Sequence, residues 1–229
     1  GRKIYSGLLG YIKQFCVDRK YKIELELHDY GDLPSKEDFF DYVKSLNLKH
    51  TPYPHQLTAC YHALTTNRSL LLSPTGSGKS LIIYILIRYL LDLNFDVNKI
   101  LVIVPTVGLV NQLYYDFESY SEKNKWDVEA NFHRIFSGQD KKTNKKIVVS
   151  TWQSLYNMPK EFFSEFEAVF GDECHLFKSK SLVSLMTKLE NAYFRIGTTG
   201  TLDGTLTHKL VLEGLFGPVF KVTSTKKLI

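Results

Sequence analysis

The sequence predicts an α/β fold in which a parallel sheet is flanked by helices on both faces. From about residue 51 onward, short and continuously apolar runs alternate with longer segments of helical periodicity. Strands that are apolar along their whole length are typical of parallel sheets, because helices bury both faces of such a sheet. Five strands are expected, at residues 69–72, 100–104, 147–150, 168–171 and 193–196.

Length and composition set limits on this fold. The 229 residues suffice for one large domain, or one and a half, with a core that needs neither disulfides nor a structural metal. An apolar fraction of 44% excludes a disordered chain. Cys16, Cys60 and Cys174 are an odd number without paired zinc spacing, which predicts a reducing compartment. The net charge of +5 permits a polyanionic partner but does not identify one.

The first 50 residues differ from the rest and predict a small α+β unit. An apolar run at 8–16 indicates a short helix, and alternating residues at 21–27 indicate a strand. A second helix is expected after Ser35, which forms a capping-box arrangement with Asp38. The chain begins with Gly1 rather than Met, so we expect a piece of a longer protein, with residues 1–50 as the remnant of an accessory domain.

The main domain is expected to span residues 51–229, after a linker that contains Pro52 and Pro54. Its most apolar segment, 81–93, is shorter than the roughly 20 residues that span a bilayer, so it predicts a core helix. Tyr84, Arg88 and Asp92 recur there every four positions and predict one solvent-facing stripe on that helix. The lysine-rich segment 141–146 predicts a solvated hairpin rather than a binding patch.

A glycine-rich turn lies between the first predicted strand of this domain and the core helix. It reads Ser73-Pro74-Thr75-Gly76-Ser77-Gly78-Lys79-Ser80. Glycines allow successive backbone N–H groups to turn toward phosphate oxygens, and the following helix adds its positive N-terminal end. We therefore predict a nucleotide site in which Lys79 reaches the β- and γ-phosphates and Ser80 ligates Mg²⁺. Ser73 stands where the strict pattern has glycine.

Two adjacent acids end another predicted strand. Asp172 and Glu173 follow the apolar run 168–171, so they should emerge at the carboxyl edge of the sheet beside the glycine-rich turn. There Asp172 can hold Mg²⁺ through water, and Glu173 can act as general base on the attacking water. A pair of surface acids is the alternative, but the separation from Lys79 fits two or three strand–helix crossings. The Cys174 side chain is expected to have only a packing role.

Several segments together resemble a known family. The run Asp172-Glu173-Cys174-His175 resembles the DEAD/DEAH-type box of superfamily 2 helicases. In the same order as in that family, other segments resemble the adenine-reading glutamine (Gln56), motif Ia (Pro105-Thr106 leading to Gln112), the Thr-x-Gln-x-Leu segment (Thr151, Gln153) and motif III (Thr199-Gly200-Thr201). In detail the chain is similar to the UvsW-type recombination and repair DNA helicases of tailed bacteriophages.

The resemblance implies a RecA-like, P-loop NTPase motor domain that uses ATP and Mg²⁺. It implies catalytic roles for Lys79, Asp172, Glu173 and His175. Gln56 has the donor and the acceptor that the Hoogsteen edge of adenine requires, so ATP is expected in preference to GTP. Tyr53 either stacks on the base or is a core aromatic residue.

The resemblance also implies a nucleic-acid grip at Pro105, Thr106, Thr151 and Gln153. Each of the two threonines can serve as a helix N-cap or as a donor to phosphate, and both roles fit the same residue. Contacts to phosphate predict little sequence specificity and weaker binding at high salt. Thr199 and Thr201 are implied to couple the two sites by bonding to Asp172 or His175.

Taken as a whole, the resemblance implies the first motor half of an ATP-dependent DNA helicase that acts on branched DNA in recombination, repair and replication-fork processing. Few residues follow Leu202, so a second motor domain is expected to be absent and this chain alone to hydrolyse ATP slowly. A cytoplasmic monomer with no membrane contact is expected, in the cytoplasm of the host cell if a phage encodes it. An RNA helicase, a restriction-type translocase subunit and a nucleotide-gated binding module without turnover are the alternatives.

Overall fold

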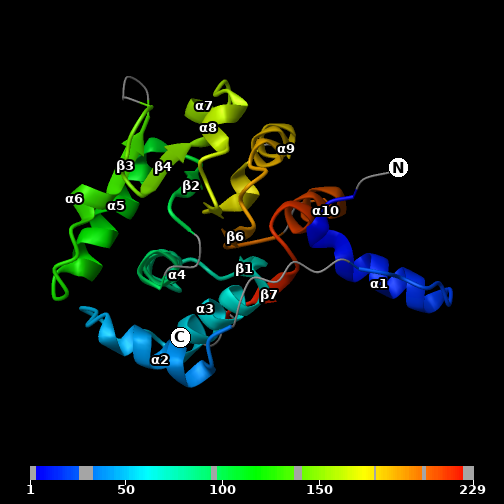
Figure 1. The fold of residues 1–229 in the computed structure, drawn as a ribbon, viewed down its shortest axis with the longest axis horizontal. Helices are drawn as coiled ribbons and strands as arrows, with labels where there is room; N and C mark the ends of the chain where they lie inside the picture. Colours follow the sequence, from blue (N-terminus) through cyan, green and yellow to red (C-terminus); the bar gives the residue numbers. More distant parts are fainter. Residues whose placement is uncertain are drawn as a thin grey trace.

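The structure is a computed structural model that describes residues 4–25, 33–93, 97–136, 141–177, 179–202 and 205–223. Within these residues, seven strands form one sheet in the order β3-β4-β2-β5-β6-β1-β7, and each neighbouring pair is parallel. Helices lie on both sides of the sheet (Figure 1). The predicted fold class, a parallel α/β sheet flanked by helices, is therefore confirmed.

All five predicted strands are present, and two edge strands were missed. The strands are β1 (Arg68–Leu72), β2 (Ile100–Val104), β3 (Phe132–Ile135), β4 (Ile147–Thr151), β5 (Ala168–Gly171), β6 (Phe194–Thr199) and β7 (Val219–Lys221). The missed strands, β3 and β7, are half-buried and contain polar residues, because each has a neighbour on one side only. Continuous apolarity therefore identified the inner strands and not the edges.

Twelve helical segments surround the sheet in the described part of the chain. They are η1 (Ser6–Leu8), α1 (Leu9–Asp18), α2 (Lys36–Ser45), α3 (Pro54–Thr66), α4 (Lys79–Asp92), α5 (Val107–Ser121), α6 (Val128–Asn131), α7 (Trp152–Leu155), α8 (Lys160–Phe163), η2 (Cys174–Leu176), α9 (Ser179–Lys188) and α10 (Leu206–Leu215). Side chains of β2 alternate between two cores. Val102 and Val104 pack with α2 to α6, whereas Leu101 and Ile103 pack with α7 to α10.

The predicted solvent-facing stripe on α4 is wrong. Every residue from 81 to 90 is buried, including Tyr84 and Arg88, and only Asp92 of the three polar positions is exposed. The Arg88 guanidinium donates to the hydroxyl of Tyr84 at 2.9 Å and to Asp92 at 3.0 Å. It also lies 4.7 Å from the ring centre of Trp126. Buried charges are tolerated when they are paired in this way.

Two further expectations fail for a topological reason. Residues 21–25 of the predicted strand 21–27 form no strand, and 26–27 lie outside the described residues. Side-chain alternation alone does not form a strand where no neighbour pairs with it. Segment 141–146 is largely exposed as expected, but it cannot close a hairpin, because the flanking strands β3 and β4 run parallel.

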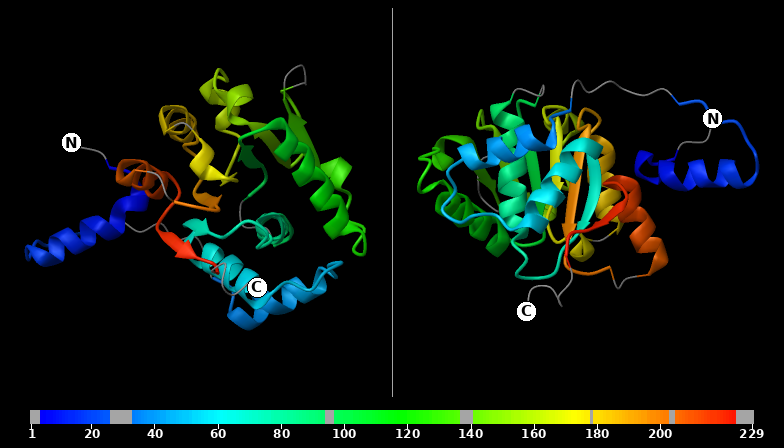
Figure 2. Two further views of the ribbon diagram at one scale, coloured as in Figure 1. Left: turned by 180° about the vertical axis from the view of Figure 1, so that it is seen from behind. Right: turned by 90° about the horizontal axis from the view of Figure 1, so that it is seen from below.

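Near the N-terminus, η1 and α1 contact α10. Figure 2 shows α1 standing away from the sheet, next to α10. Gly7 lies so close to α10 that a Cβ at this position would meet the carbonyl oxygen of Glu213 at 1.9 Å. Tyr11 donates a 2.8 Å hydrogen bond to the Glu213 carboxylate. In α2, the predicted cap is present: the Ser35 hydroxyl accepts the Asp38 N–H.

Of the predictions made from the cysteines, the structure bears on the packing role of Cys174. Cys16, Cys60 and Cys174 are free, and Cys174 is fully buried as the packing role requires. Among the described helices, none combines the length and the apolarity that a bilayer crossing needs.

Candidate nucleotide site

The glycine-rich turn and the acidic pair meet at the carboxyl edge of the sheet. The turn follows β1, the acids follow β5, and β6 lies between these two strands. They enclose a cavity of about 360 Å³. Its lining residues come from the turn, from α5 and from the acidic pair: Thr75, Gly76, Gly78, Lys79, Ser80, Leu109, Gln112, Leu113, Asp116, Asp172 and Glu173.

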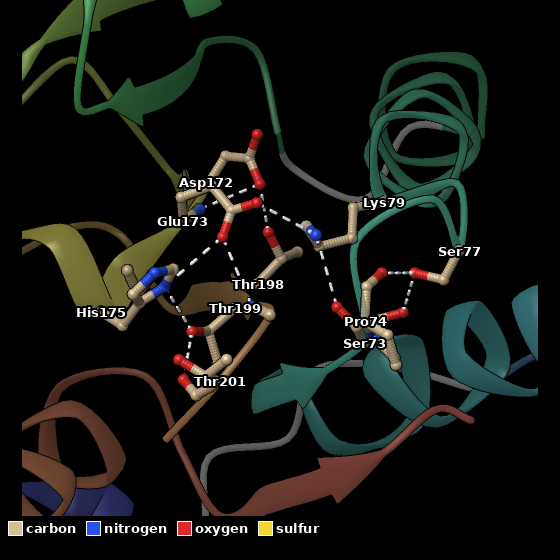
Figure 3. A network of polar contacts seen from close by, with 12 residues as sticks. Ser73, Pro74, Ser77, Lys79, Asp172, Glu173, His175, Thr198, Thr199 and Thr201 are labelled. Atoms are coloured by element: carbon tan, nitrogen blue, oxygen red, sulfur yellow. Dashed lines mark hydrogen bonds and ion pairs between the residues drawn. The ribbon is translucent and has the colours of Figure 1, made fainter. Parts of the chain in front are cut away.

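The Ser73 side chain makes a contact within the glycine-rich turn. Its hydroxyl is buried and lies 2.5 Å from the hydroxyl of Ser77, which in turn donates to the Pro74 carbonyl at 2.6 Å. These contacts are visible in Figure 3. The serine that replaces the expected glycine therefore ties the beginning of the turn to its middle.

Gln56 supports the turn from α3. Its side chain is only 3% exposed, and its Nε2 donates to the Ser77 carbonyl at 2.9 Å. Its Oε1 accepts the N–H of Tyr53 at 2.8 Å and so closes the capping box of α3. An amide side chain has two donor hydrogens and two acceptor positions, so one of each is still available for a base.

Tyr53 is not a core aromatic residue. Its side chain is 65% exposed, and its ring stacks on His55 with a centroid distance of 5.6 Å and an interplanar angle of 12°. The structure thus overturns the core alternative and leaves an exposed flat surface next to Gln56.

Lys79 and Glu173 form an ion pair across the cavity (Figure 3). The Nζ atom lies 3.0 Å from Oε1 of Glu173 and donates to the Ser73 carbonyl at 3.3 Å. The other carboxylate oxygen accepts the N–H of Gly200 at 3.3 Å. Glu173 has a positive φ of 50°, a left-handed conformation that is uncommon for residues other than glycine. Such strained backbone is concentrated at functional sites.

Asp172 is held by a residue that sequence reasoning missed. Its Oδ1 accepts the hydroxyl of Thr198 at 2.5 Å and the N–H of Glu173 at 3.0 Å. Burial raises the pKa of Asp172 above its usual value, the hydrogen bond from Thr198 opposes that rise, and the neighbouring charge of Glu173 adds to it. Thr198 precedes the segment that resembles motif III, and only the position of β6 between β1 and β5 reveals its contact.

Thr199 lies next to His175. Its hydroxyl donates to the Thr201 carbonyl at 2.7 Å, so it has only its lone pairs for His175, whose Nδ1 lies 2.9 Å away. We therefore assign the proton to Nδ1. His175 also lies 3.4 Å from the Glu173 carboxylate. Thr201 takes part through its backbone, while its side chain is exposed.

Ser80 lies beside two residues of α5 that the sequence did not reveal. Its hydroxyl is 2.8 Å from the hydroxyl of Tyr120. Burial raises the pKa of Asp116, and a hydrogen bond with Ser80 opposes that rise. The described residues contain no cluster of three or more His, Cys, Asp or Glu that could hold a metal. Mg²⁺ needs no such cluster, since it is usually bound by one or two protein oxygens together with phosphates and water.

The two threonines expected at a nucleic-acid surface cap helices. Thr106 accepts the Leu109 N–H at 3.3 Å and begins α5, and Thr151 accepts the Ser154 N–H at 3.4 Å and begins α7. Thr151 is the last residue of β4 and Thr106 follows the neighbouring strand β2, so both lie on the same edge of the sheet as the nucleotide cavity. Thr106 and Gln153 are exposed, whereas Pro105 and Thr151 are buried.

A parallel sheet that presents a phosphate-binding turn and an acidic pair across one cavity defines a P-loop nucleotide-binding domain. The profile of the family described as "Type III restriction enzyme, res subunit" matches residues 49–204. The chain is 36% identical to the ATP-dependent DNA helicase UvsW of Enterobacteria phage T4. The alignment covers 100% of this chain and 46% of the UvsW sequence.

Two crystal structures of the bacteriophage T4 protein superpose on this chain. A structure of the UvsW helicase has a TM-score of 0.84 at 35% identity and covers 94% of this chain and 78% of its own. A second UvsW structure has a TM-score of 0.83 at 32% identity and covers 96% and 46%. The chain belongs to the superfamily 2 helicases, in the group of UvsW-type proteins. It spans about half the length of the curated relative that it matches, 46%.

Proposed function

We propose that this chain contains the first motor domain, residues 51–229, of an ATP-dependent DNA helicase or translocase. The observation that carries this proposal is the meeting of Lys79, Asp172 and Glu173 around one cavity at the carboxyl edge of the sheet. Family membership supports an ATP-dependent motor rather than another class of P-loop protein. Residues 1–50 would be an accessory segment attached through α10 and the α2–α4 contacts.

The residues of the cavity have separate roles in this proposal. Lys79 binds the phosphates and positions them, as the lysine of such loops does. Glu173 accepts the proton of the attacking water through its carboxylate. His175 donates to Thr199 at the end of β6 and lies 3.4 Å from the Glu173 carboxylate, so it stands between the base and that strand. Gln56 reads the base, and the exposed Tyr53 ring offers it a stacking surface.

The cavity also fits Mg²⁺, with Ser80 and Asp172 as the oxygen ligands. Both residues line the same cavity as Lys79. When bound, the ion neutralises charge on the β- and γ-phosphates. The raised pKa of Asp172 supports this role, because a buried carboxylate is stabilised when a cation lies beside it.

DNA is the proposed nucleic acid, bound along its phosphates by the helix ends at Thr106 and Thr151. The exposed Thr106 hydroxyl and the N–H groups that begin α5 ahead of Leu109 are suitable donors. The name of the T4 relative, a DNA helicase, favours DNA over RNA. We further propose a branched DNA substrate, a monomer as the active form and the host cytoplasm as the location. A restriction-type translocase is the second candidate, because the matching family profile carries that description.

Nucleic-acid stimulation of ATP hydrolysis by the intact protein tests the proposal. Phosphate release would be measured with single-stranded DNA, branched DNA and RNA of equal length, with Lys79→Ala as the inactive control. We expect the strongest stimulation by branched DNA and none in Lys79→Ala. Equal stimulation by RNA would favour an RNA helicase. Phosphate release that no nucleic acid changes, with nucleotide still bound, would indicate a binding module without turnover.

A further inference from the structure

Two residues of α5 reach the proposed magnesium ligand Ser80. Asp116 and Tyr120 are four positions apart, so they lie on one face of the helix. The Tyr120 hydroxyl is 2.8 Å from the Ser80 hydroxyl, and the Asp116 side chain lines the nucleotide cavity. Neither residue belongs to the segments that carry the family resemblance.

The packing of Tyr120 fixes the direction of its hydroxyl. Its ring lies edge-on against the buried ring of Tyr84, with centroids 5.4 Å apart. Tyr84 in turn bonds to Ser121 on α5 at 2.9 Å. The aromatic contact therefore holds α5 against α4, and the polar end of Tyr120 is left facing Ser80.

Asp116 adds a third carboxylate to the cavity that Asp172 and Glu173 already line. Lys79, the cation of the turn, pairs with Glu173 at 3.0 Å. A half-buried carboxylate is stabilised by a cation or by donated hydrogen bonds. Metal-bound water supplies such donors, and residues that bind it orient the ion and tune its affinity.

We propose that Asp116 and Tyr120 are positioning residues of the magnesium site. Tyr120 holds the Ser80 hydroxyl in place, and Asp116 accepts a hydrogen bond from water on the ion. This inference rests on the proposed binding of Mg²⁺ by Ser80 and Asp172. In this proposal, the glycine-rich turn and the acidic pair supply the ligands Ser80 and Asp172, and α5 supplies the residues that position them and the ion.

Nucleotide binding by the intact protein, measured as a function of Mg²⁺ concentration with a fluorescent ATP analogue, tests the inference. The variants are Asp116→Asn and Tyr120→Phe, which keep the shape of each side chain. Tyr115→Phe and Glu118→Gln, at exposed positions of the same helix, are the matched controls. We expect the Mg²⁺ concentration for half-maximal binding to rise about tenfold in Asp116→Asn, and by less in Tyr120→Phe. Binding in EDTA should not change in either.

Three outcomes would contradict the inference. Unchanged Mg²⁺ curves in both α5 variants, with a shifted curve in Ser80→Ala, would overturn the roles of Asp116 and Tyr120 and leave the magnesium site intact. An equal loss of binding with Mg²⁺ and in EDTA would show that the two residues only support the fold. An unchanged curve in Ser80→Ala and Asp172→Asn would overturn the proposed magnesium site together with this inference.

Discussion

The Nζ atom of Lys79 and the Oε1 atom of Glu173 lie 3.0 Å apart, so the cation expected to bind phosphate and the carboxylate expected to activate water neutralise each other. A triphosphate that attracts Lys79 has to weaken this pair. The Glu173 carboxylate is then released to accept a proton, while the Gly200 N–H continues to hold its other oxygen. Substrate binding and the release of the base would in this way be one event.

Glu173→Gln should separate nucleotide binding from hydrolysis. The amide cannot accept the proton, so turnover should fall by about 10²–10⁴-fold. Nucleotide affinity should be equal or higher, because Lys79 loses a competing charge. Steady-state phosphate release and nucleotide binding by the intact protein measure the two quantities, with the exposed Glu190→Gln as control. Undiminished turnover would remove Glu173 from the role of base.

Asp172→Asn should lose Mg²⁺-dependent hydrolysis without loss of stability. The Asn Oδ1 atom can still accept from Thr198 and from the Glu173 N–H. Because burial raises the pKa of Asp172, the ionised form is less favourable in the folded than in the unfolded protein. The variant should therefore unfold at an equal or higher temperature at pH 7.

The raised pKa of Asp172 also predicts that the stability effect of Asp172→Asn depends on pH. The cost of the ionised Asp172 is present above its raised folded-state pKa and disappears as the pH falls toward the usual carboxyl range. The difference in melting temperature between Asp172→Asn and the unmodified protein should thus shrink from pH 7 toward pH 4. A variant that is less stable at pH 7, with a gap that widens in acid, would show that the Asp172 carboxylate stabilises the fold.

Gly78→Ala and Gly76→Ala form a matched pair in the glycine-rich turn. Both glycines have a φ near +80°, so each substitution carries a similar backbone strain of about 1 kcal/mol or more. A Cβ at Gly78 would also meet Nε2 of Gln56 at 2.2 Å, whereas nothing lies within 4 Å at Gly76. Gly78→Ala should therefore lower the melting temperature further than Gly76→Ala.

Truncation of Gln56 checks the cause of that difference. If the clash with the Gln56 amide is responsible, Gly78→Ala should cost less in a Gln56→Ala background than in the unmodified protein. Additive losses in the double variant would place the strain elsewhere in the turn.

Ser73→Gly restores the strict phosphate-loop pattern and should nevertheless destabilise the domain. It removes the buried hydroxyl that contacts Ser77 and adds backbone freedom to the unfolded chain. Together these effects should lower the free energy of unfolding by about 1–2 kcal/mol in chemical denaturation. Ser73→Ala, which removes the same hydroxyl without adding backbone freedom, separates the two effects. A more stable Ser73→Gly protein would show that the hydroxyl contact contributes nothing.

The sequence was sufficient for features that depend on neighbouring residues. The inner strands, the caps at Ser35 and Thr106 and the glycine-rich turn follow from local apolarity and short spacing. The meeting of Asp172 with the turn followed from one topological rule, that parallel strands present their carboxyl ends on the same edge.

Features that depend on distant partners could not be predicted. The spacing of Arg88 is that of a surface residue. In the structure its partner Asp92 also accepts a hydrogen bond from Tyr42, 50 positions away in the sequence, and no local pattern indicates that contact. Thr198 and Tyr120 carry no sequence signal for their contacts with Asp172 and Ser80, because those contacts depend on strand order and helix packing. The stacking of Tyr53 on His55 likewise appears only once α3 is placed.

The burial of α4 limits which parts of the domain can move. Residues 81–90 are all shielded from water, so displacement of this helix would require disruption of the hydrophobic interior. The glycine-rich turn is thereby anchored to a fixed helix, and the amides within α4 should resist hydrogen exchange until global unfolding. In a motor domain of the proposed kind, we expect movement instead at the carboxyl ends of β5 and β6, around Glu173 and Thr199, because these residues are not part of the buried helix.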